Sequence, residues 1–358
     1  MKRKSNRLRV RRLFVMGAGA SFSASQPRTG PSDRQAPLDK DFTSRMCNLS
    51  VGKPGWVNDS VARIQREWKD QIPFTDFGLE LAIIRQLGHL EFIDAIHPRR
   101  RRNAPSPYEW LNHVTHLIAY VLRRSHESSR ESYRRFVDWI FPEVKDIALQ
   151  RDRIVTFNYD DLLDRHIVAR AGIEQTYFDR IKSGRYESDR RDRVHPHPLL
   201  VKLHGSVNWR CTEEEFRRIV DPQAAEISDD PFYLDTVWYA GTGTPSPDDP
   251  TQPLIVPPLP VKPITQISLF RFLWTKAYEY LHEAEHIIVC GYSLPDADKL
   301  AASLFGNFVN KDLRFVTVID PDPAVLRKWK KLLRRPNVGR ARWNYYEDFD
   351  EYVRDRAS

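Results

Sequence analysis

The sequence predicts an α/β fold, with a parallel sheet and helices on both of its faces. Three patterns indicate this class: short apolar runs that end at small or polar residues, helical repeats between those runs, and glycine turns where a strand gives way to a helix. With 41% hydrophobic and 29% charged residues among 358, the chain is globular rather than disordered in composition.

A first strand is expected at 12–16, and a turn of small residues follows it directly. The turn holds Gly17, Ala18, Gly19, Ala20 and Ser21, and Phe22 comes next. Small residues let backbone amides approach an anion closely, and a helix that begins here adds partial positive charge. Phe22 stands where the dinucleotide fingerprint has its third glycine, so a tight turn without a ligand is an alternative.

Residues 40–150 carry helical patterns and few strand signals. The clearest segment has apolar residues at i, i+3 and i+4 spacing, namely Trp110, Leu111, Val114, Leu117, Ile118, Val121 and Leu122. We therefore expect a helical module at 40–150, inserted between the first and second strands. The sheet and its covering helices would then come from 12–39 and 151–358, within a single domain that spans 1–358.

The second strand is expected at 153–157, and polar residues crowd together after it. Asn158 and Asp160 follow at the strand end, where open α/β sheets place ligands and chemistry. Asn158 is neither an acid nor a base, but its amide can hold a ribose hydroxyl or a water in place. Asp160 could hydrogen-bond a ligand or cap the following helix, and the sequence leaves both roles open.

A third strand is expected at 199–203, and it ends at His204. A histidine at a strand end can act as a general base near neutral pH, although a structural histidine is the alternative. No Ser-His-Asp or Cys-His set is apparent, and the phosphate-loop motif of ATPases is absent from the sequence.

The C-terminal part shows the most regular alternation. A helix is expected at 268–283, a strand at 285–290 that ends in Gly291, Tyr292 and Ser293, and a strand at 313–319 that ends in Asp320. Strand, turn, helix and strand form a right-handed unit of a Rossmann-like sheet, and an acid after the second strand is where ribose hydroxyls are accepted. A last strand is expected near 341–345. A nucleotide lying along the shared edge of this sheet would contact every strand end.

Charge and cysteine content restrict the partners and the compartment. The formal net charge of +8 and the basic segments 2–12 and 99–102 favour contact with phosphate groups, although solvated segments explain them as well. Cys47, Cys211 and Cys290 form no CxxC pair, so neither a cysteine zinc site nor a disulfide framework is expected, which fits a reducing cytosol. The pair His195 and His197 lacks a carboxylate at ligand spacing and favours a loop. No apolar run reaches the roughly 20 residues that a membrane helix needs.

Taken together and in order, these motifs resemble the sirtuin superfamily. The turn 17–21 resembles its nucleotide-binding motif, 156–160 its central Asn/Asp motif, and 204–205 its catalytic His-Gly pair. The segment 291–293 and Asp320 resemble its later nucleotide-contacting segments. The resemblance extends over residues 14–320.

Finer details resemble the sirtuin-like branch found in prokaryotic anti-phage defence. Tyr159 between Asn158 and Asp160, and the run 202–206 followed by Trp209, are similar to that branch. The helical insertion would replace the zinc-bearing lobe of the protein deacylases. Only Cys211 stands where those enzymes carry a four-cysteine module, so no zinc is expected.

The resemblance implies an NAD hydrolase that cleaves NAD to nicotinamide and ADP-ribose, and so kills an infected cell by NAD depletion (abortive infection). It implies catalytic roles for Asn158, His204 and Asp160. The implied NAD-contacting residues are Gly17, Ala18, Gly19, Ala20, Ser21, Phe22, Asn158, Asp160, Gly291, Tyr292, Ser293 and Asp320.

No sensor domain is apparent after the α/β core, so the activating signal is expected from partners. A homo-oligomer, a HerA-type ATPase and DNA bound by the basic segments are the partners considered. Two other functions compete with NAD hydrolysis. One is a zinc-free, NAD-dependent protein deacylase or ADP-ribosyltransferase, and the other is a nucleic-acid-binding module on a sirtuin-like scaffold.

Overall fold

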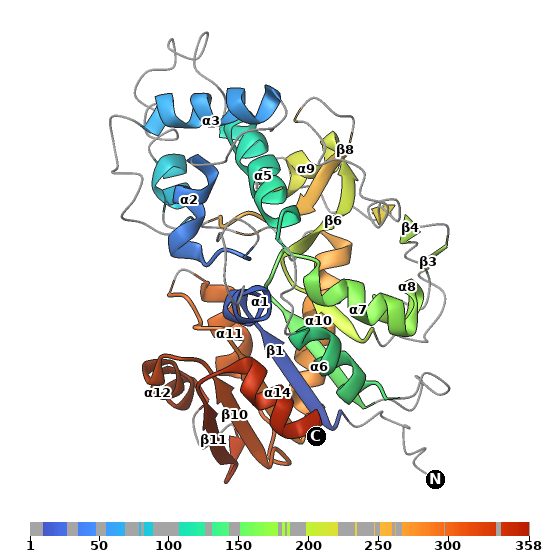
Figure 1. Ribbon diagram of the computed structural model, residues 1–358. Helices are drawn as coiled ribbons and strands as arrows, with labels where there is room; N and C mark the ends of the chain where they lie inside the picture. Colours follow the sequence, from blue (N-terminus) through green and yellow to red (C-terminus); the bar gives the residue numbers. More distant parts are fainter. Residues whose placement is uncertain are drawn as a thin grey trace.

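A six-stranded parallel sheet lies at the centre of the computed structural model (Figure 1). Its strands, in spatial order, are β11 (Arg342–Tyr346), β10 (Phe315–Ile319), β9 (His286–Cys290), β1 (Arg12–Met16), β2 (Asp152–Thr156) and β5 (Leu200–Lys202). Every neighbouring pair is parallel, and the six strands correspond to the six apolar runs of the sequence. The carboxyl ends therefore lie along one edge, as predicted.

The structure describes residues 10–26, 35–47, 55–68, 79, 82–88, 107–125, 131–142, 151–177, 181–182, 185–186, 198–220, 233–234, 247, 251–259, 262, 267–296, 298–333 and 338–357. The basic segments 2–9 and 99–102 and the pair His195 and His197 lie outside these ranges. None of the helices within these ranges is both long and apolar enough to cross a membrane.

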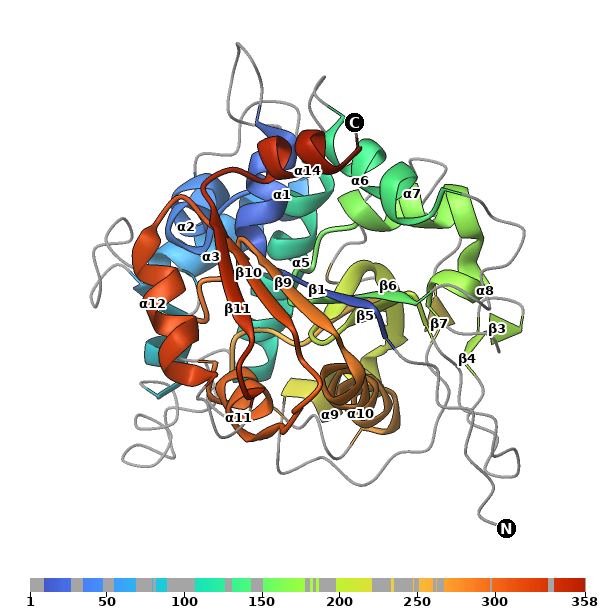
Figure 2. The ribbon, with the colours of Figure 1, turned by 90° about the horizontal axis from the view of Figure 1, so that it is seen from below.

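Helices cover both faces of the sheet, which is why most residues of its inner strands are buried (Figure 2), while the edge strand β11 is partly exposed. One face carries α1 (Ala18–Ser25), α6 (Ser132–Ile140), α7 (Leu162–Ala171) and α14 (Phe349–Ala357), and the short α8 (Ile173–Thr176) follows α7. The other face carries α10 (Ser268–Glu283), α11 (Lys299–Asn307) and α12 (Pro323–Leu332). On the first face Phe136 of α6 packs edge-on against Phe14 of β1, with ring centroids 4.9 Å apart. Although α6 lies within the predicted helical module, it packs on the central sheet.

A second body lies beyond the carboxyl edge of the sheet (Figure 1). It contains α2 (Asp39–Cys47), α3 (Gly55–Trp68), α5 (Pro107–Arg123) and α9 (Glu213–Val220). It also contains part of a second, antiparallel sheet. The strands of that sheet are, in spatial order, β3 (Ile181–Lys182), β4 (Arg185–Tyr186), β7 (Tyr233–Leu234), β6 (Gly205–Thr212) and β8 (Thr251–Ile255). The helices α2, α3 and α5 come from the stretch for which the helical module was predicted, and α5 packs against β6 and β8. The second sheet was not predicted from the sequence.

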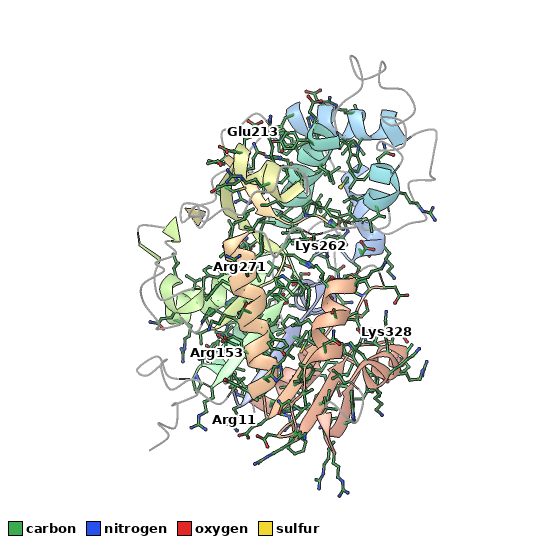
Figure 3. All side chains as sticks on the ribbon, turned by 180° about the vertical axis from the view of Figure 1, so that it is seen from behind. Arg11, Arg153, Glu213, Lys262, Arg271 and Lys328 are labelled. Carbon is green, nitrogen blue, oxygen red and sulfur yellow. The ribbon has the colours of Figure 1, made fainter. Side chains whose placement is uncertain are left out.

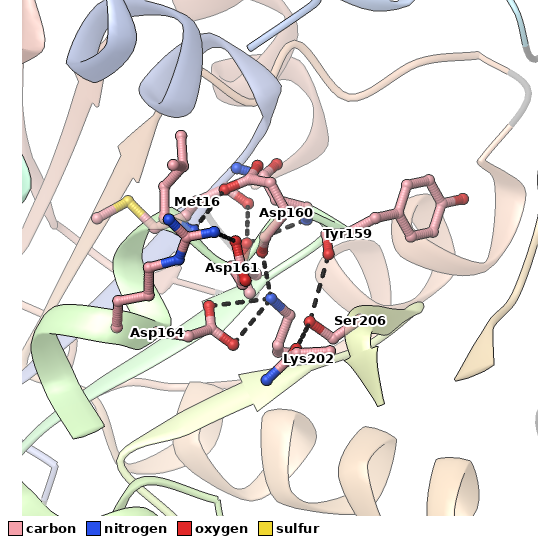
Figure 4. A network of polar contacts seen from close by, with 12 residues as sticks. Met16, Tyr159, Asp160, Asp161, Asp164, Lys202 and Ser206 are labelled. Atoms are coloured by element: carbon pink, nitrogen blue, oxygen red, sulfur yellow. Dashed lines mark hydrogen bonds and ion pairs between the residues drawn. The ribbon is translucent and has the colours of Figure 1, made fainter. Parts of the chain in front are cut away.

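A buried ion pair joins β5 to α7 at the start of that helix (Figure 4). The Lys202 ammonium lies 3.0 Å from both carboxylate oxygens of Asp164, and the side chains are 0% and 2% exposed. Lys202 also donates to the backbone carbonyl of Asp160, and the Tyr177 hydroxyl donates to Asp164. Burial raises the pKa of Asp164, and the charge of Lys202 opposes that rise. The pair therefore anchors the stretch that carries Asn158 and Asp160.

Replacing Lys202 by methionine is expected to lower the free energy of unfolding by about 3–5 kcal/mol, because it leaves Asp164 buried without its cation. Urea denaturation followed by circular dichroism measures this loss. The double variant Lys202→Met/Asp164→Leu should recover most of it, since it removes both charges together. A native denaturation midpoint for Lys202→Met alone would show that the pair does not hold the fold.

Candidate active site

A cavity of about 810 Å³ opens at the carboxyl edge of the central sheet. Most of the predicted site residues line it: Ala18, Gly19, Ala20, Phe22, Asn158, Asp160, His204, Gly291, Tyr292, Ser293 and Asp320. Gly17 and Ser21 are not among the lining residues, but both contact Asn158. Phe42 of α2 and Leu122 of α5 close the cavity from the second body. Its size falls within the range of small-molecule and cofactor sites.

The glycines of the first turn pack against the turn after β9. A Cβ on Gly17 would lie 2.5 Å from the Gly291 carbonyl oxygen, and one on Gly291 would lie 2.3 Å from the Ala20 nitrogen. Gly291 also has a φ of +57°, a conformation that other residues rarely adopt. The Gly17 and Gly19 amides donate to the carbonyls of Cys290 and Gly291. These glycines therefore bring two strand ends into contact, and the start of α1 directs its partial positive charge to the cavity.

Asn158 is held in one orientation by its own amide. Its Nδ2 donates to the Gly17 carbonyl at 2.9 Å and to Ser21 Oγ at 3.0 Å. Its backbone N–H donates to Thr156 Oγ1 at 3.0 Å. Because the amide nitrogen is committed to the first turn, Oδ1 is the atom that remains for a ligand in the cavity. The predicted role of Asn158 in positioning a ribose hydroxyl or a water stays a prediction.

Asp160 contacts the start of the helix that follows it, although the N-cap residue of α7 is Asp161. Its Oδ1 accepts a hydrogen bond from the Leu162 N–H at the start of α7, at 3.2 Å. The carboxyl group is buried, and burial raises its pKa although Lys202 and Ser21 oppose the rise. Asp160 also lines the cavity, so its predicted contact with a ligand remains a prediction.

His204 lies two residues after β5 and faces two charged side chains. Its Nε2 is 3.2 Å from the Lys262 Nζ and 3.7 Å from Asp298 Oδ2. Lys262 is the cation labelled between the two bodies in Figure 3. Burial, followed by the charge of Lys262, lowers the pKa of His204 to about 3, although Asp298 acts in the opposite direction. The imidazole is therefore neutral across the physiological pH range and keeps a lone pair for a proton.

Aromatic rings enclose the same imidazole. The ring of Phe157 lies 5.4 Å from it, that of Tyr159 6.1 Å, and that of Trp274 6.2 Å, measured between centroids. Phe157 in turn stacks on Tyr292, with centroids 4.1 Å apart and ring planes 2° from parallel. A dry surrounding of this kind strengthens the electrostatic interactions within it.

Asp320 lies after β10, at the place where the sequence predicted a ribose contact. Its Oδ1 accepts from the Asp322 N–H at 2.9 Å. Burial raises its pKa, the hydrogen bond from the Asp322 N–H opposes that rise, and the charge of Asp322 adds to it. The carboxyl group lines the same cavity as Ser293 and His204. Acceptors for hydroxyl groups therefore lie toward the β10 end of the cavity, and the neutral base lies toward β5.

Sequence reasoning missed Lys262 and Asp298. Asp298 caps α11 by accepting from the Ala301 N–H at 3.3 Å, a role that its position before an apolar repeat could have indicated. Lys262 stands in a proline-rich stretch without periodicity, and no sequence pattern marks it. Within the described residues, no group of three or more His, Cys, Asp or Glu side chains is placed to hold a metal ion.

The fold and the cavity define an α/β protein with a ligand site along the carboxyl edge of a parallel sheet. No protein-family model and no curated protein matches the sequence. Two solved structures of Sir2 homologues are similar in fold, one described as an NAD complex and the other as a mutant in complex with ADP-ribose. The first is 12% identical in sequence and has a TM-score of 0.42, and the match covers 97% of this chain and 88% of the other chain. The second is 13% identical and has a TM-score of 0.40, and the match covers 97% of this chain and 90% of the other chain. Because both likenesses are distant, the fold assignment rests on the strand order and pairing.

Proposed function

We propose that this chain is an NAD hydrolase that cleaves NAD to nicotinamide and ADP-ribose. The observation that supports it is the convergence of Asn158, His204 and Asp320 with the α1 turn around one cavity. The start of α1 suits a diphosphate, and Asp320 suits ribose hydroxyls. Asn158 and His204 then lie toward the opposite end, where the nicotinamide ribose would bind.

In the proposed reaction the bond between ribose and nicotinamide breaks, and its electron pair leaves with the ring. The cationic nicotinamide of NAD becomes neutral, and the ribose carbon gains oxocarbenium character. A water then attacks that carbon and loses a proton, which the neutral His204 accepts. Asn158 Oδ1 holds the ribose or the attacking water by accepting a hydrogen bond.

The direct test is to incubate the purified chain with NAD alone and to follow nicotinamide and ADP-ribose by chromatography. Release of both in equal amounts without an acyl peptide supports the hydrolase. Release that requires an acylated peptide would instead support the deacylase, and transfer of ADP-ribose onto protein would support the transferase.

The low pKa of His204 predicts the pH dependence of this activity. Because His204 loses its base form only as the pH falls toward about 3, kcat/KM for NAD should show no acid limb from this group near pH 6.5. Rates measured from about pH 8 to about pH 5 check this, since kcat/KM reports the free enzyme. The variants Asp160→Asn and Asp320→Asn show whether an acid limb of the pH profile is caused by titration of either carboxyl group. A limb near pH 6.5 that survives in both variants would contradict the assignment of His204.

The biological setting that we propose is anti-phage defence by NAD depletion, as the motif resemblance implies. The trigger would be a HerA-type ATPase, self-assembly, or DNA. Adding each to the purified chain and measuring the change in NAD turnover tests these partners separately.

Nucleic-acid contact is a second candidate, and one feature of the structure favours it. Arg11, Arg12, Arg314 and Arg356 line another cavity, of about 250 Å³, at the amino edge of the sheet. The guanidinium of Arg12 lies 4.3 Å from the Trp139 ring centroid. Arg12 is already paired with Asp152, so contact with phosphates would come from the other three arginines. Arg11 lies at the end of the molecule away from Lys262 in Figure 3, so the two sites are separate.

Arg11→Ala/Arg314→Ala is expected to weaken DNA binding and its salt dependence, while Asn158→Ala leaves both unchanged. Fluorescence anisotropy with labelled single-stranded DNA at several salt concentrations measures this. Equal affinities for the native chain and the double arginine variant would exclude nucleic-acid binding at this cavity.

A further inference from the structure

The group that faces the base atom of His204 is a cation. The Lys262 Nζ lies 3.2 Å from His204 Nε2 and 3.3 Å from Asp298 Oδ1, and the lysine and aspartate side chains are each 5% exposed. An ammonium group carries three donors and no acceptor. In the contact with Lys262, therefore, Nε2 must be the acceptor, and the ring proton must sit on Nδ1.

The Asp298 carboxylate is held in place from three sides. Tyr292 donates its hydroxyl to Oδ2 at 3.1 Å, the Ala301 N–H donates to Oδ1 at 3.3 Å, and Lys262 donates to Oδ1. Burial alone would raise the pKa of Asp298, but His204 and Lys262 together lower it. The acid is thus ionised and fixed, with its Oδ2 3.7 Å from His204 Nε2.

We propose that Lys262 and Asp298 are positioning residues for His204: Lys262 fixes the Nδ1-protonated tautomer and covers the Nε2 lone pair until a substrate hydroxyl or water replaces it. Asp298 retains its hydrogen bond with Lys262 when Lys262 moves away from the imidazole ring. The incoming O–H bond then breaks, the N–H bond forms at Nε2, and Asp298 stabilises the imidazolium that results. This inference rests on the proposed function for its catalytic meaning, although the tautomer and the contacts do not.

Among the residues that the structure describes, the charged groups that face His204 are Lys262 and Asp298, and the titratable hydroxyls nearby are those of Tyr159 and Tyr292. Tyr159 donates its hydroxyl to the Val256 carbonyl, so it is engaged elsewhere. Removing the cation leaves the aspartate unopposed, and protonation of the imidazole becomes easier. Removing Asp298 has the opposite effect and makes protonation of the imidazole harder.

Nitrogen NMR of isotope-labelled histidine tests the proposal without any substrate. The His204 signal is identified by its absence in His204→Asn. In the native protein it should show the Nδ1-protonated tautomer and should not titrate between about pH 8 and about pH 4. In Lys262→Met its titration should move up by about 1–3 pH units, and Lys262→Arg should restore the native behaviour because arginine also only donates.

Lys299→Met is the matched control, because it removes an exposed lysine beside Asp298 that does not face the ring. A native His204 with its proton on Nε2 would overturn the proposal, and so would an unchanged titration in Lys262→Met. The native tautomer needs only the His204→Asn assignment, so a Lys262 variant that fails to fold leaves that part of the test intact. If the NMR results hold but the chain does not turn over NAD, the proposed function fails and the positioning pair stands.

Discussion

His204→Ala is expected to lower NAD hydrolysis by about 10²–10⁴-fold, the usual cost of removing a positioned base. His204 is 5% exposed, and its Nε2 is the atom that we propose accepts the proton. No other histidine lines the described part of the cavity, so none can take its place. Steady-state release of nicotinamide measures the loss, and binding of ADP-ribose by calorimetry shows whether the cavity is intact.

His166→Ala serves as the matched control for this loss. His166 lies on α7, outside the residues that line the cavity. The control should turn over NAD at the native rate. If His204→Ala also kept the native rate while remaining folded, proton transfer would have to be assigned to another group.

Asn158→Ala is expected to lower the rate by about 10²-fold or more, since small misplacements of the reacting groups cost that much. The variant loses Oδ1 in the cavity and also the hydrogen bonds that Nδ2 donates to the Gly17 carbonyl and Ser21 Oγ. Asn158→Asp separates the two effects, because it keeps an acceptor but cannot donate to the Gly17 carbonyl. We expect both variants to be impaired, with nicotinamide release as the readout.

Asn307→Ala is the control for this variant, because Asn307 is exposed at the end of α11 and bonds only locally to Ser303. It should leave turnover unchanged. Native turnover in both Asn158 variants would mean that the amide serves only to hold the first turn.

Much of the fold could be predicted because the inner parallel strands are buried on both faces. Their sequences are mostly apolar runs, and the regular helix expected at 268–283 is α10 with the same limits. The antiparallel sheet was harder to predict. Val207, Trp209 and Cys211 of β6 alternate with polar residues, which is a strand signal. Those polar residues are nevertheless buried and bonded within the fold, as when Asn208 donates to the Tyr177 hydroxyl, and no sequence pattern shows such partners.

The site could be predicted where it lies at strand ends and not where it depends on the second body. Asn158, His204 and Asp320 follow apolar runs, so parallel topology alone brings them to one edge. Lys262 is 58 residues from His204 in the chain and reaches it from the connection after β8. Its contact depends on tertiary packing, which neither periodicity nor composition records. The low pKa of His204 follows from that contact and from burial.

The central claim is that this cavity hydrolyses NAD through Asn158 and His204. The most direct measurement compares nicotinamide release from NAD by the native chain and by the Asn158→Ala/His204→Ala double variant, alone and with DNA or a HerA-type ATPase added. We expect stoichiometric nicotinamide and ADP-ribose from the native chain without an acyl peptide, and none above background from the double variant. Equal release by the two proteins would contradict the claim, as would a native chain that neither binds nor consumes NAD under any of these conditions.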